Sequence, residues 1–450
     1  MPHFDFSQSC IKRSLHDASL LATSETPYYL TISLFVIYLC LCHGQQICFG
    51  VTAIKIELER RKKTKKRLWV KKWISNRHYL GASSTLLKEL AVDDQLSYRN
   101  IMRMSTDNFE NRLCLTKSMI QKQDTNMRMA LPAKLKLEIK LRFLATGDSF
   151  KSLQYLFRVP ACTISKFLPE VLDAITEALK SYLKYQSNVP TTNDEWAKIA
   201  ELYDRRWNFP KCCGSIDGKH VQIKKPINNG SAFYNYKGTF SVILFALVDA
   251  NYCFRYLDIG GNGRASDSAI FRDSTLNIAM ENDTLGFPDE HVIIGDDAFP
   301  LRIKLMKPYS KRKLSNEEVI FNYRLSRARR VVENAFGILV WRFRVFLRPI
   351  ELQPSTVDKV IWSACALHNW IRMTNSNAYF PSNAVDTEDL NTGVVTSGLW
   401  RDFTSGLAST SQLGSNNYKQ DAESIRKKYT DFFFNEGSVP WQWQKCGITD

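Results

Sequence analysis

Three acidic residues that lie far apart in the chain could together carry out metal-assisted chemistry on a phosphodiester. Asp217 and Asp296 each follow a short apolar, strand-like run, and Glu333 lies within a helical stretch. Attack on a phosphodiester requires negative charge to be neutralised on both the attacking and the leaving oxygen. Two Mg²⁺ ions about 4 Å apart do this when clustered carboxylates hold them. The sequence therefore predicts that Asp217, Asp296 and Glu333 are catalytic residues and ligands of Mg²⁺ or Mn²⁺.

Each of these carboxylates also has a purely structural interpretation. Asp217 precedes Gly218 and could be a turn residue. Asp296 competes with Asp297, which could assist it or cap a helix, and Glu333 could pair with a neighbouring arginine. Three further aspartates have a similar local setting: Asp249, Asp258 and Asp267. Spacing alone therefore does not select the triad.

Basic side chains accompany the carboxylates. Lys219 and His220 follow Asp217, and the helical stretch around Glu333 is rich in arginine. Such a strip can face the phosphates of a nucleic acid, although a solvated helix face has the same composition, and His220 also suits a structural role. The residues predicted to bind nucleic acid are Arg327, Arg329, Arg330, Lys219 and His220.

The composition indicates a basic globular protein. The 450 residues include 61 Lys and Arg against 45 Asp and Glu, which gives a net charge of +16. This surplus favours a polyanionic partner, with DNA first and an anionic membrane surface second, and does not by itself imply catalysis. The 11 cysteines contain no CxxC pair, which argues against a zinc finger and favours free thiols in a reducing compartment.

The first 56 residues form an apolar N-terminal extension of uncertain role. Tyr28–Cys42 is uncharged but shorter than the roughly 20 residues of a spanning helix, and Ile47–Ile54 adds a second apolar run. A buried helix, a weak anchor and an extension outside the functional domain remain open. We favour the last, so that a membrane association is not expected. The basic block Arg60–Arg67 fits a nuclear-localisation signal, a nucleic-acid patch or a solvated linker.

The rest of the chain divides into three parts. Residues 57–200 are expected to be helical, and Pro132–Leu183 suggests a helix-turn-helix unit or a plain helical bundle. Residues 211–373 are expected to form an α/β domain, and residues 374–450 a polar tail with one short helix near Ala422–Phe434.

Within residues 211–373 the apolar periodicity changes from helical to strand-like. The predicted strands are two short ones within Cys213–Ile223, joined by a glycine turn, followed by Phe240–Val248, Tyr252–Ile259 and His291–Gly295. The predicted helices are Ser266–Met280, Arg324–Phe346 and Val357–Met373.

Several long motifs in fixed order resemble those of the PIF/Harbinger transposases and the nucleases derived from them, over roughly Trp69–Met373. They are Cys213–His220, Asn235–Gly238, Phe240–Ser241, Leu247–Asn251, Gly260–Ser268, Gly295–Leu301, Asn322–Gly337 and Leu367–Asn369. The resemblance implies an RNase H-like fold and assigns the three catalytic positions to Asp217, Asp296 and Glu333. It has no counterpart before about Leu68.

The resemblance also sets expectations for function. It implies a divalent-metal-dependent DNA endonuclease with strand transfer as a further activity, in the nucleus or also the cytoplasm. It further implies a separate Myb/SANT- or MADF-like DNA-binding partner, and a homo-oligomer is open. The alternative is a domesticated, catalytically silent protein that binds DNA or chromatin. A membrane-anchored protein of unrelated role is a third hypothesis, and it depends only on residues 28–54.

Overall fold

The computed structural model describes most of the chain after residue 69. The described residues are 70–126, 128–183, 190, 192–227, 230–310, 312–374, 382–389, 392–403, 407–410 and 420–448, together with Lys55. The chain divides into two units, Met1–Lys71 and Lys72–Asp450, of which the second is described below. The apolar runs within residues 28–54 and the basic block Arg60–Arg67 lie outside the described residues. Within the described part, no helix combines the length and the apolar character needed to cross a bilayer.

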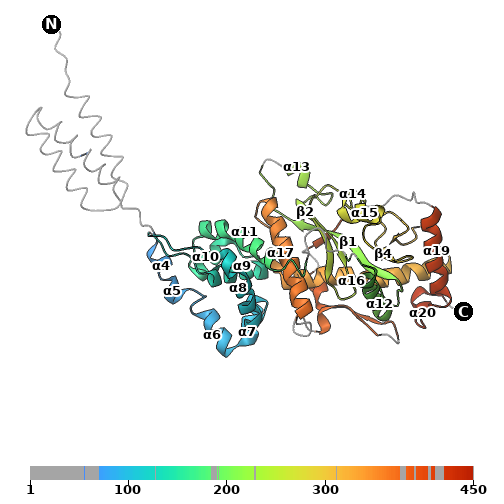
Figure 1. The fold of residues 1–450 in the computed structure, drawn as a ribbon, viewed down its shortest axis with the longest axis horizontal. Helices are drawn as coiled ribbons and strands as arrows, with labels where there is room; N and C mark the ends of the chain where they lie inside the picture. The colour runs from blue at the N-terminus through green and yellow to red at the C-terminus, as the bar shows by residue number, and fades with distance from the viewer. Residues whose placement is uncertain are drawn as a thin grey trace, which may run out of the picture. The chain divides into compact units, whose positions relative to one another are not determined.

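Residues 72–207 are helical wherever the structure assigns them a regular element (Figure 1). The helices are α4 (Lys72–Ser75), α5 (Arg77–Leu80), α6 (Leu86–Asp93), α7 (Gln95–Met102), α8 (Thr106–Ile120), α9 (Ala133–Thr146), α10 (Phe150–Phe157), α11 (Ala161–Ala178) and α12 (Asn193–Trp207).

Local sequence signals explain most of these boundaries. Gly147 ends α9 with a left-handed φ of 69°, and the Ser149 side chain caps α10 by accepting from Ser152 N. α11 begins at Ala161, directly after Pro160. Proline presets a φ suited to a helix start.

The α/β part is built on one mixed sheet with strand order β3-β2-β1-β4-β5. β1, β2 and β3 are antiparallel neighbours, whereas β1–β4 and β4–β5 are parallel. A short strand from the C-terminal region, β8, also pairs with β1. The strands are β1 (Cys212–Gln222), β2 (Ser241–Val248), β3 (Phe254–Asn262), β4 (Val292–Ile294), β5 (Leu305–Met306) and β8 (Leu407–Ser409).

Helices cover this sheet. Every residue of β2 is buried, as expected for a continuously apolar central strand. The helices that contact the sheet are α12, α14 (Asp267–Asp273), α16 (Asn316–Arg342) and α17 (Pro354–Thr374). The remaining elements are α13 (Gly230–Phe233), α15 (Thr275–Glu281), η1 (Arg344–Leu347), η2 (Ser382–Ala384), β6 (Thr387–Glu388), β7 (Val395–Thr396), η3 (Leu399–Phe403), α19 (Gln420–Phe434) and α20 (Gln442–Cys446).

Three predicted elements differ from the observed ones. The predicted glycine turn at Gly218 is wrong, since β1 runs through it and pairs with β2 on both sides of it. The single helix predicted over Ser266–Met280 is divided, because Ser274 adopts an extended conformation and caps α15. The helix of Glu333 begins before the predicted Arg324, where the capping box of Ser315 and Glu318 starts α16.

The C-terminal region is more structured than a polar tail. The Trp400 ring packs so closely on Gly337 of α16 that a Cβ there would overlap it, and Trp400 Nε1 donates to Asn334 Oδ1 (2.7 Å). Phe433 of α19 is fully buried and contacts Phe209 and Phe321. A composition rich in Asn, Ser and Thr conceals these few aromatic anchors, which is why the sequence suggested a loop.

Candidate functional site

The structure brings two buried aspartates and a half-buried one into one cluster. Each of Asp217, Asp267 and Asp296 offers a carboxylate oxygen, and these oxygens all lie within 4.8 Å of one another. Asp217 is in the middle of β1, Asp267 begins α14, and Asp296 follows β4. Because β4 lies beside β1 in the sheet, the end of β4 carries Asp296 next to Asp217.

Gly218 provides the space that Asp267 occupies. A Cβ at Gly218 would overlap the Asp267 carboxylate and come within 2.5 Å of Thr410 Oγ1. The Thr410 hydroxyl donates a hydrogen bond to Asp267 Oδ1. The absence of a side chain at Gly218 therefore lets a carboxylate from α14 reach the surface of β1.

Burial and mutual repulsion disturb the ionisation of this cluster. Burial, followed by the charge of Asp217, raises the pKa of Asp267 to about 7. The same two causes, in the same order, raise the pKa of Asp296 above its ordinary value. Carboxylates held this close cannot all carry their charge without a nearby cation.

Lys219 supplies one positive charge to the cluster. Its Nζ lies 2.7 Å from Asp217 Oδ2, and the lysine side chain is only 14% exposed. Burial lowers the pKa of Lys219, but the attraction of Asp217 and, more weakly, of Glu333 outweighs it, so that the pKa is raised overall. Lys219, which the sequence predicted to bind nucleic acid, is therefore a buried counter-ion of Asp217.

The donor set of the cluster fits a hard divalent cation. Asp267 Oδ2 is buried and accepts no hydrogen bond from the described residues, whereas the buried Asp217 Oδ2 is paired with Lys219. Mg²⁺ and Mn²⁺ favour carboxylate oxygens, and a bound cation would remove the cost of leaving Asp267 Oδ2 without a partner. Asp217, Asp267 and Asp296 are the residues that would hold it.

Glu333 does not belong to the aspartate cluster. Its side chain is 36% exposed, with Arg329 at 3.8 Å and Arg401 at 4.0 Å. Its charge nevertheless acts on Lys219, which pairs with Asp217, so α16 presents Glu333 near the cluster. The three predicted catalytic residues are thus divided, with two in the cluster and one beside it.

A segment of the C-terminal region is anchored next to the site. Asp386 is buried and accepts two hydrogen bonds from Arg401, at 2.9 and 2.5 Å, while Arg401 also faces Glu333. Further along, Thr410 contacts Asp267. Residues C-terminal to the predicted catalytic domain therefore contact both Glu333, through Arg401, and Asp267, through Thr410.

The other predicted basic residues lie in different environments. Arg327 is 1% exposed, with Nε 2.7 Å from Glu388, so it is not available to a phosphate in this structure. Arg329 and Arg330 remain partly exposed, at 16% and 17% of their side chains. His220 is buried, and its Nδ1 is 2.9 Å from Ser241 Oγ. Burial, aided by Lys237 and Lys219, lowers the pKa of His220 to about 4.

Asp249 and Asp258, whose local sequence setting is similar to that of Asp267, lie outside the aspartate cluster. Asp249 accepts from the amides of Asn251 and Cys253 in the turn after β2, and Asp258 lies on β3. Asp297, the neighbour of Asp296, is 40% exposed and pairs with Lys307 at 3.3 Å. The one available signal for Asp267 was its position at a serine-capped helix start, which by itself indicates only a cap.

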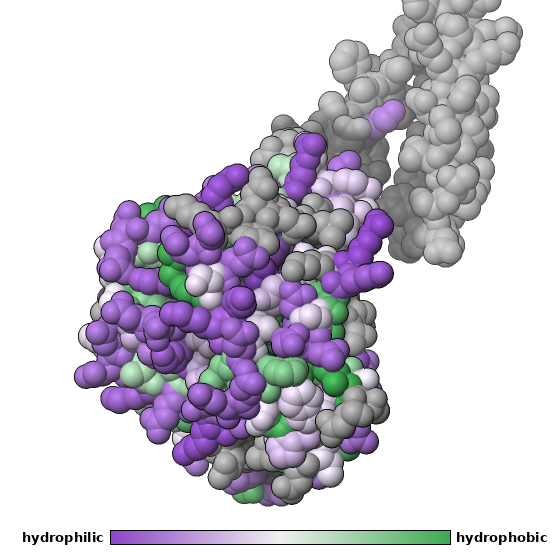
Figure 2. Space-filling view, turned by 90° about the vertical axis from the view of Figure 1, so that its right-hand side faces the viewer, coloured by the Kyte–Doolittle hydropathy of each residue, from purple (hydrophilic) through white to green (hydrophobic). Residues whose placement is uncertain are grey.

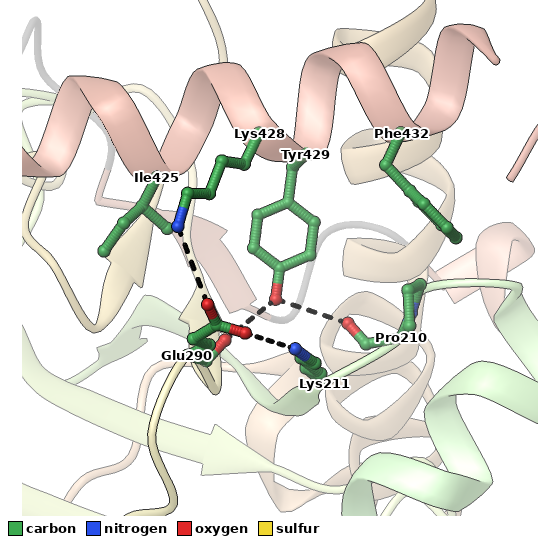
Figure 3. A pocket seen from close by; sticks show the side chains of 7 residues that line it. All are labelled: Pro210, Lys211, Glu290, Ile425, Lys428, Tyr429 and Phe432. Atoms are coloured by element: carbon green, nitrogen blue, oxygen red, sulfur yellow. Dashed lines mark hydrogen bonds and ion pairs between the residues drawn. The ribbon is translucent and has the colours of Figure 1, made fainter. Parts of the chain in front are cut away.

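A separate pocket of about 250 Å³ contains none of these carboxylates (Figure 3). Tyr429 of α19 points its hydroxyl toward the carbonyls of Pro210 and Glu290, and Lys211 and Lys428 both pair with the Glu290 carboxylate. The surrounding face of the molecule is mainly hydrophilic, with apolar side chains in small groups (Figure 2). This pocket does not adjoin the aspartates along β1, since Lys211 precedes that strand and Asp217 lies roughly 20 Å further on.

Part of the chain matches a family of known proteins. Residues 216–369, which include Asp217, Asp267, Asp296 and Glu333, match the family model of the DDE superfamily endonucleases. No solved structure matches the chain.

Three curated relatives are similar to this chain. Protein ALP1-like of Arabidopsis thaliana is 24% identical over 298 residues, covering 62% of this chain and 71% of the relative. Protein Antagonist of Like Heterochromatin Protein 1, also of Arabidopsis thaliana, is 23% identical over 297 residues, with coverages of 62% and 74%. The protein named "Putative nuclease HARBI1" of Xenopus laevis is 21% identical over 251 residues, with coverages of 54% and 69%.

Residues 216–369 thus match a DDE superfamily endonuclease domain. The chain is similar to proteins derived from PIF/Harbinger transposases.

Replacing Gly218 with alanine should weaken both the fold and cation binding. The added methyl group displaces the Asp267 carboxylate, and such overpacking costs about 1–3 kcal/mol of the free energy of unfolding. Denaturant unfolding and a calorimetric Mn²⁺ titration measure the two effects. Gly261→Ala is the control, because a Cβ there meets its nearest atom at an ordinary 3.5 Å. Unchanged values for Gly218→Ala would contradict this account of the glycine.

The metal-free protein should lose stability through Asp267 as the pH rises from 5 toward 7. An unfolded aspartate titrates near 4, whereas the pKa of Asp267 in the folded protein is about 7. Between these values the folded state binds a proton that the unfolded state has lost, so stability falls with increasing pH. Thermal unfolding in EDTA from about pH 5 to pH 8 tests this. The Tm of the wild type relative to that of Asp267→Asn should fall over this range, and a constant or rising difference argues against it.

Proposed function

We propose that this protein is a divalent-metal-dependent DNA endonuclease of the DDE type, in which Asp217, Asp296 and Glu333 are the catalytic carboxylates. One observation carries the proposal: two of these residues, from separate parts of the chain, meet in a cluster with Asp267, whose buried Oδ2 accepts no hydrogen bond from the described residues. The family model over residues 216–369 supports the same activity. Asp267 enters the proposal as a further ligand.

We also propose that the sheet is RNase H-like. The support is its topology, in which an antiparallel β3-β2-β1 meander continues through β1 into the parallel strands β4 and β5. This arrangement sets Asp217 on the central strand and Asp296 after the adjacent parallel strand. Ligands of mixed and parallel sheets commonly bind at such strand ends.

The chain's own residues have distinct parts in the proposed reaction. A bound Mg²⁺ or Mn²⁺ would polarise the phosphate and activate water, or a freed 3′-OH in strand transfer. Asp217, Asp267 and Asp296 hold the cation, and Lys219 balances the remaining negative charge. Glu333 approaches from α16, where Arg329 and Arg401 hold it in the present arrangement.

Partly exposed basic residues are proposed to bind the DNA backbone. Arg329 and Arg330 lie on the helix that carries Glu333, and each exposes about a sixth of its side chain. A guanidinium group can bind a phosphate through two parallel hydrogen bonds. The net charge of +16 further favours attraction to DNA, which salt should weaken.

A catalytically silent chromatin protein is the second candidate. One similar protein is named as an antagonist of Like Heterochromatin Protein 1, which points to chromatin rather than to cleavage. Both candidates place the protein in the nucleus and allow a separate Myb/SANT- or MADF-like DNA-binding partner. Fractionation of cells that express the tagged full chain tests the nuclear location, and recovery in the membrane fraction would argue against it.

A cleavage assay with a carboxylate series tests the proposed activity. The full chain should nick plasmid DNA in Mg²⁺ or Mn²⁺ and not in EDTA. Loss of a catalytic carboxylate removes several kcal/mol of transition-state stabilisation, so Asp217→Asn, Asp296→Asn and Glu333→Gln should each cleave at least about 100-fold more slowly.

Two further variants make this assay decisive. Asp258→Asn is the matched control and should cleave like the wild type, because Asp258 lies on β3 outside the cluster. Asp267→Asn should lose Mn²⁺ affinity as well as rate. Equal cleavage by the wild type and all the carboxylate variants would overturn the assignment. DNA binding without any cleavage would instead favour the chromatin protein.

A further inference from the structure

A pair of half-exposed tyrosines stands out on the segment that joins β1 to β2. The side chains of Tyr234 and Tyr236 are 50% and 52% exposed, although most aromatic residues of the sheet domain are buried. The Tyr234 ring packs against Phe240 at 5.3 Å between centroids, and Lys237 Nζ lies 5.4 Å from the centre of the Tyr236 ring. Exposed rings with a neighbouring ammonium group form a surface on which flat, electron-rich groups can stack.

This segment is held rigidly by the buried side chain of Asn235. Asn235 Nδ2 donates to Thr239 Oγ1 and Ser241 Oγ, both at 2.9 Å. Its Oδ1 accepts from the backbone amides of Lys237 and Thr239 at 3.0 Å. The two tyrosines therefore keep their positions before any ligand binds, which lowers the entropic cost of stacking.

The tyrosines are connected to the aspartate cluster. Tyr236 OH donates to Ser409 O (3.0 Å), and the next residue, Thr410, donates to Asp267. The ring of His220 lies 5.9 Å from that of Tyr236, and His220 is three residues along β1 from Asp217. At about 3.3 Å per strand residue, His220 lies roughly 10 Å along β1 from Asp217, and the Tyr236 ring lies beyond it. The tyrosines are therefore within a few nucleotides of a phosphate at the cluster.

The charge around the tyrosines suits a nucleic acid. The exposed basic residues of this part of the chain are Lys224, Lys225, Lys237 and Arg264. Among these, Lys224 lies 3.5 Å from Glu351, so that four cations face one acidic partner in the described part of this region. Aromatic rings interleaved with cations are the combination that binds single-stranded nucleic acid, in which base faces are accessible.

We propose that Tyr234 and Tyr236 bind unpaired bases next to the scissile phosphate, so that the preferred substrate is DNA opened at the cleavage site. In an intact duplex the faces of the bases are stacked on each other, and an external tyrosine cannot reach them. This inference rests on the proposed nuclease function for its location beside the cleavage site. The stacking itself requires no catalysis.

Binding of fluorescent DNA to the full chain in EDTA tests the inference without any contribution from cleavage. The probes are a duplex, the same duplex with a short central run of unpaired bases, and that second probe with abasic sites in place of the unpaired bases. The wild type should bind the opened duplex about fivefold or more tightly than the closed one, and the abasic sites should remove this preference.

Variants of the tyrosines identify the residues responsible. The double variant Tyr234→Ala, Tyr236→Ala should bind all three probes with the affinity of the wild type for the closed duplex. Tyr236→Phe should retain the preference, because it keeps the ring and loses only the hydrogen bond to Ser409. Tyr79→Ala is the control, since Tyr79 is 80% exposed on α5 and should not affect binding.

The possible results separate this inference from the proposed function. A wild type with equal affinity for bases and abasic sites, or a double alanine variant that keeps its preference, overturns the inference. If the protein cleaves DNA but shows no preference for unpaired bases, only the stacking proposal fails. If it prefers unpaired bases but never cleaves, the nuclease proposal fails and the stacking surface stands.

Discussion

The repulsion among three closely spaced carboxylates, two of them buried, is the constraint on which the site depends. Asp217, Asp267 and Asp296 place their oxygens within 4.8 Å of one another, where burial and like charge both favour protonation. A folded chain tolerates such an arrangement only when positive charge offsets it. Lys219 provides part of that charge, and a divalent cation would provide the rest and a partner for the buried Asp267 Oδ2, which accepts no hydrogen bond from the described residues. The cluster therefore lowers the stability of the metal-free protein, and a bound cation would offset this cost.

The rest of the fold can be understood as the support for this cluster. β1 carries Asp217 through the centre of the sheet, and its pairing with β4 brings Asp296 alongside. Gly218 leaves the space through which Asp267 approaches from α14. Glu333 lies on α16, and the ring of Trp400 from the C-terminal region packs against this helix. Small changes in any of these supports should reach the carboxylates.

The C-terminal region links this framework to the surface where a substrate would bind. β8 pairs with β1, Thr410 contacts Asp267, and Ser409 accepts from Tyr236. Arg401, held by Asp386, faces Glu333. Residues of the C-terminal region therefore contact the aspartate cluster, Glu333 and Tyr236, and a shift in these residues would affect all three together.

The sequence by itself determined most helices and strands, and it placed Asp217 and Asp296 at strand positions. Apolar periodicity located β2, β3, β4 and the long helices, because burial requires apolar residues at regular spacing. Ordered motifs identified Asp217, Asp296 and Glu333 as candidates and the family that the chain resembles. Only the tertiary structure decided that Asp267 joins the cluster, that β1 continues through Gly218, that Arg327 is buried and that the C-terminal region returns to the site. These features depend on contacts between residues distant in the chain, which leave no periodic signal in the local sequence.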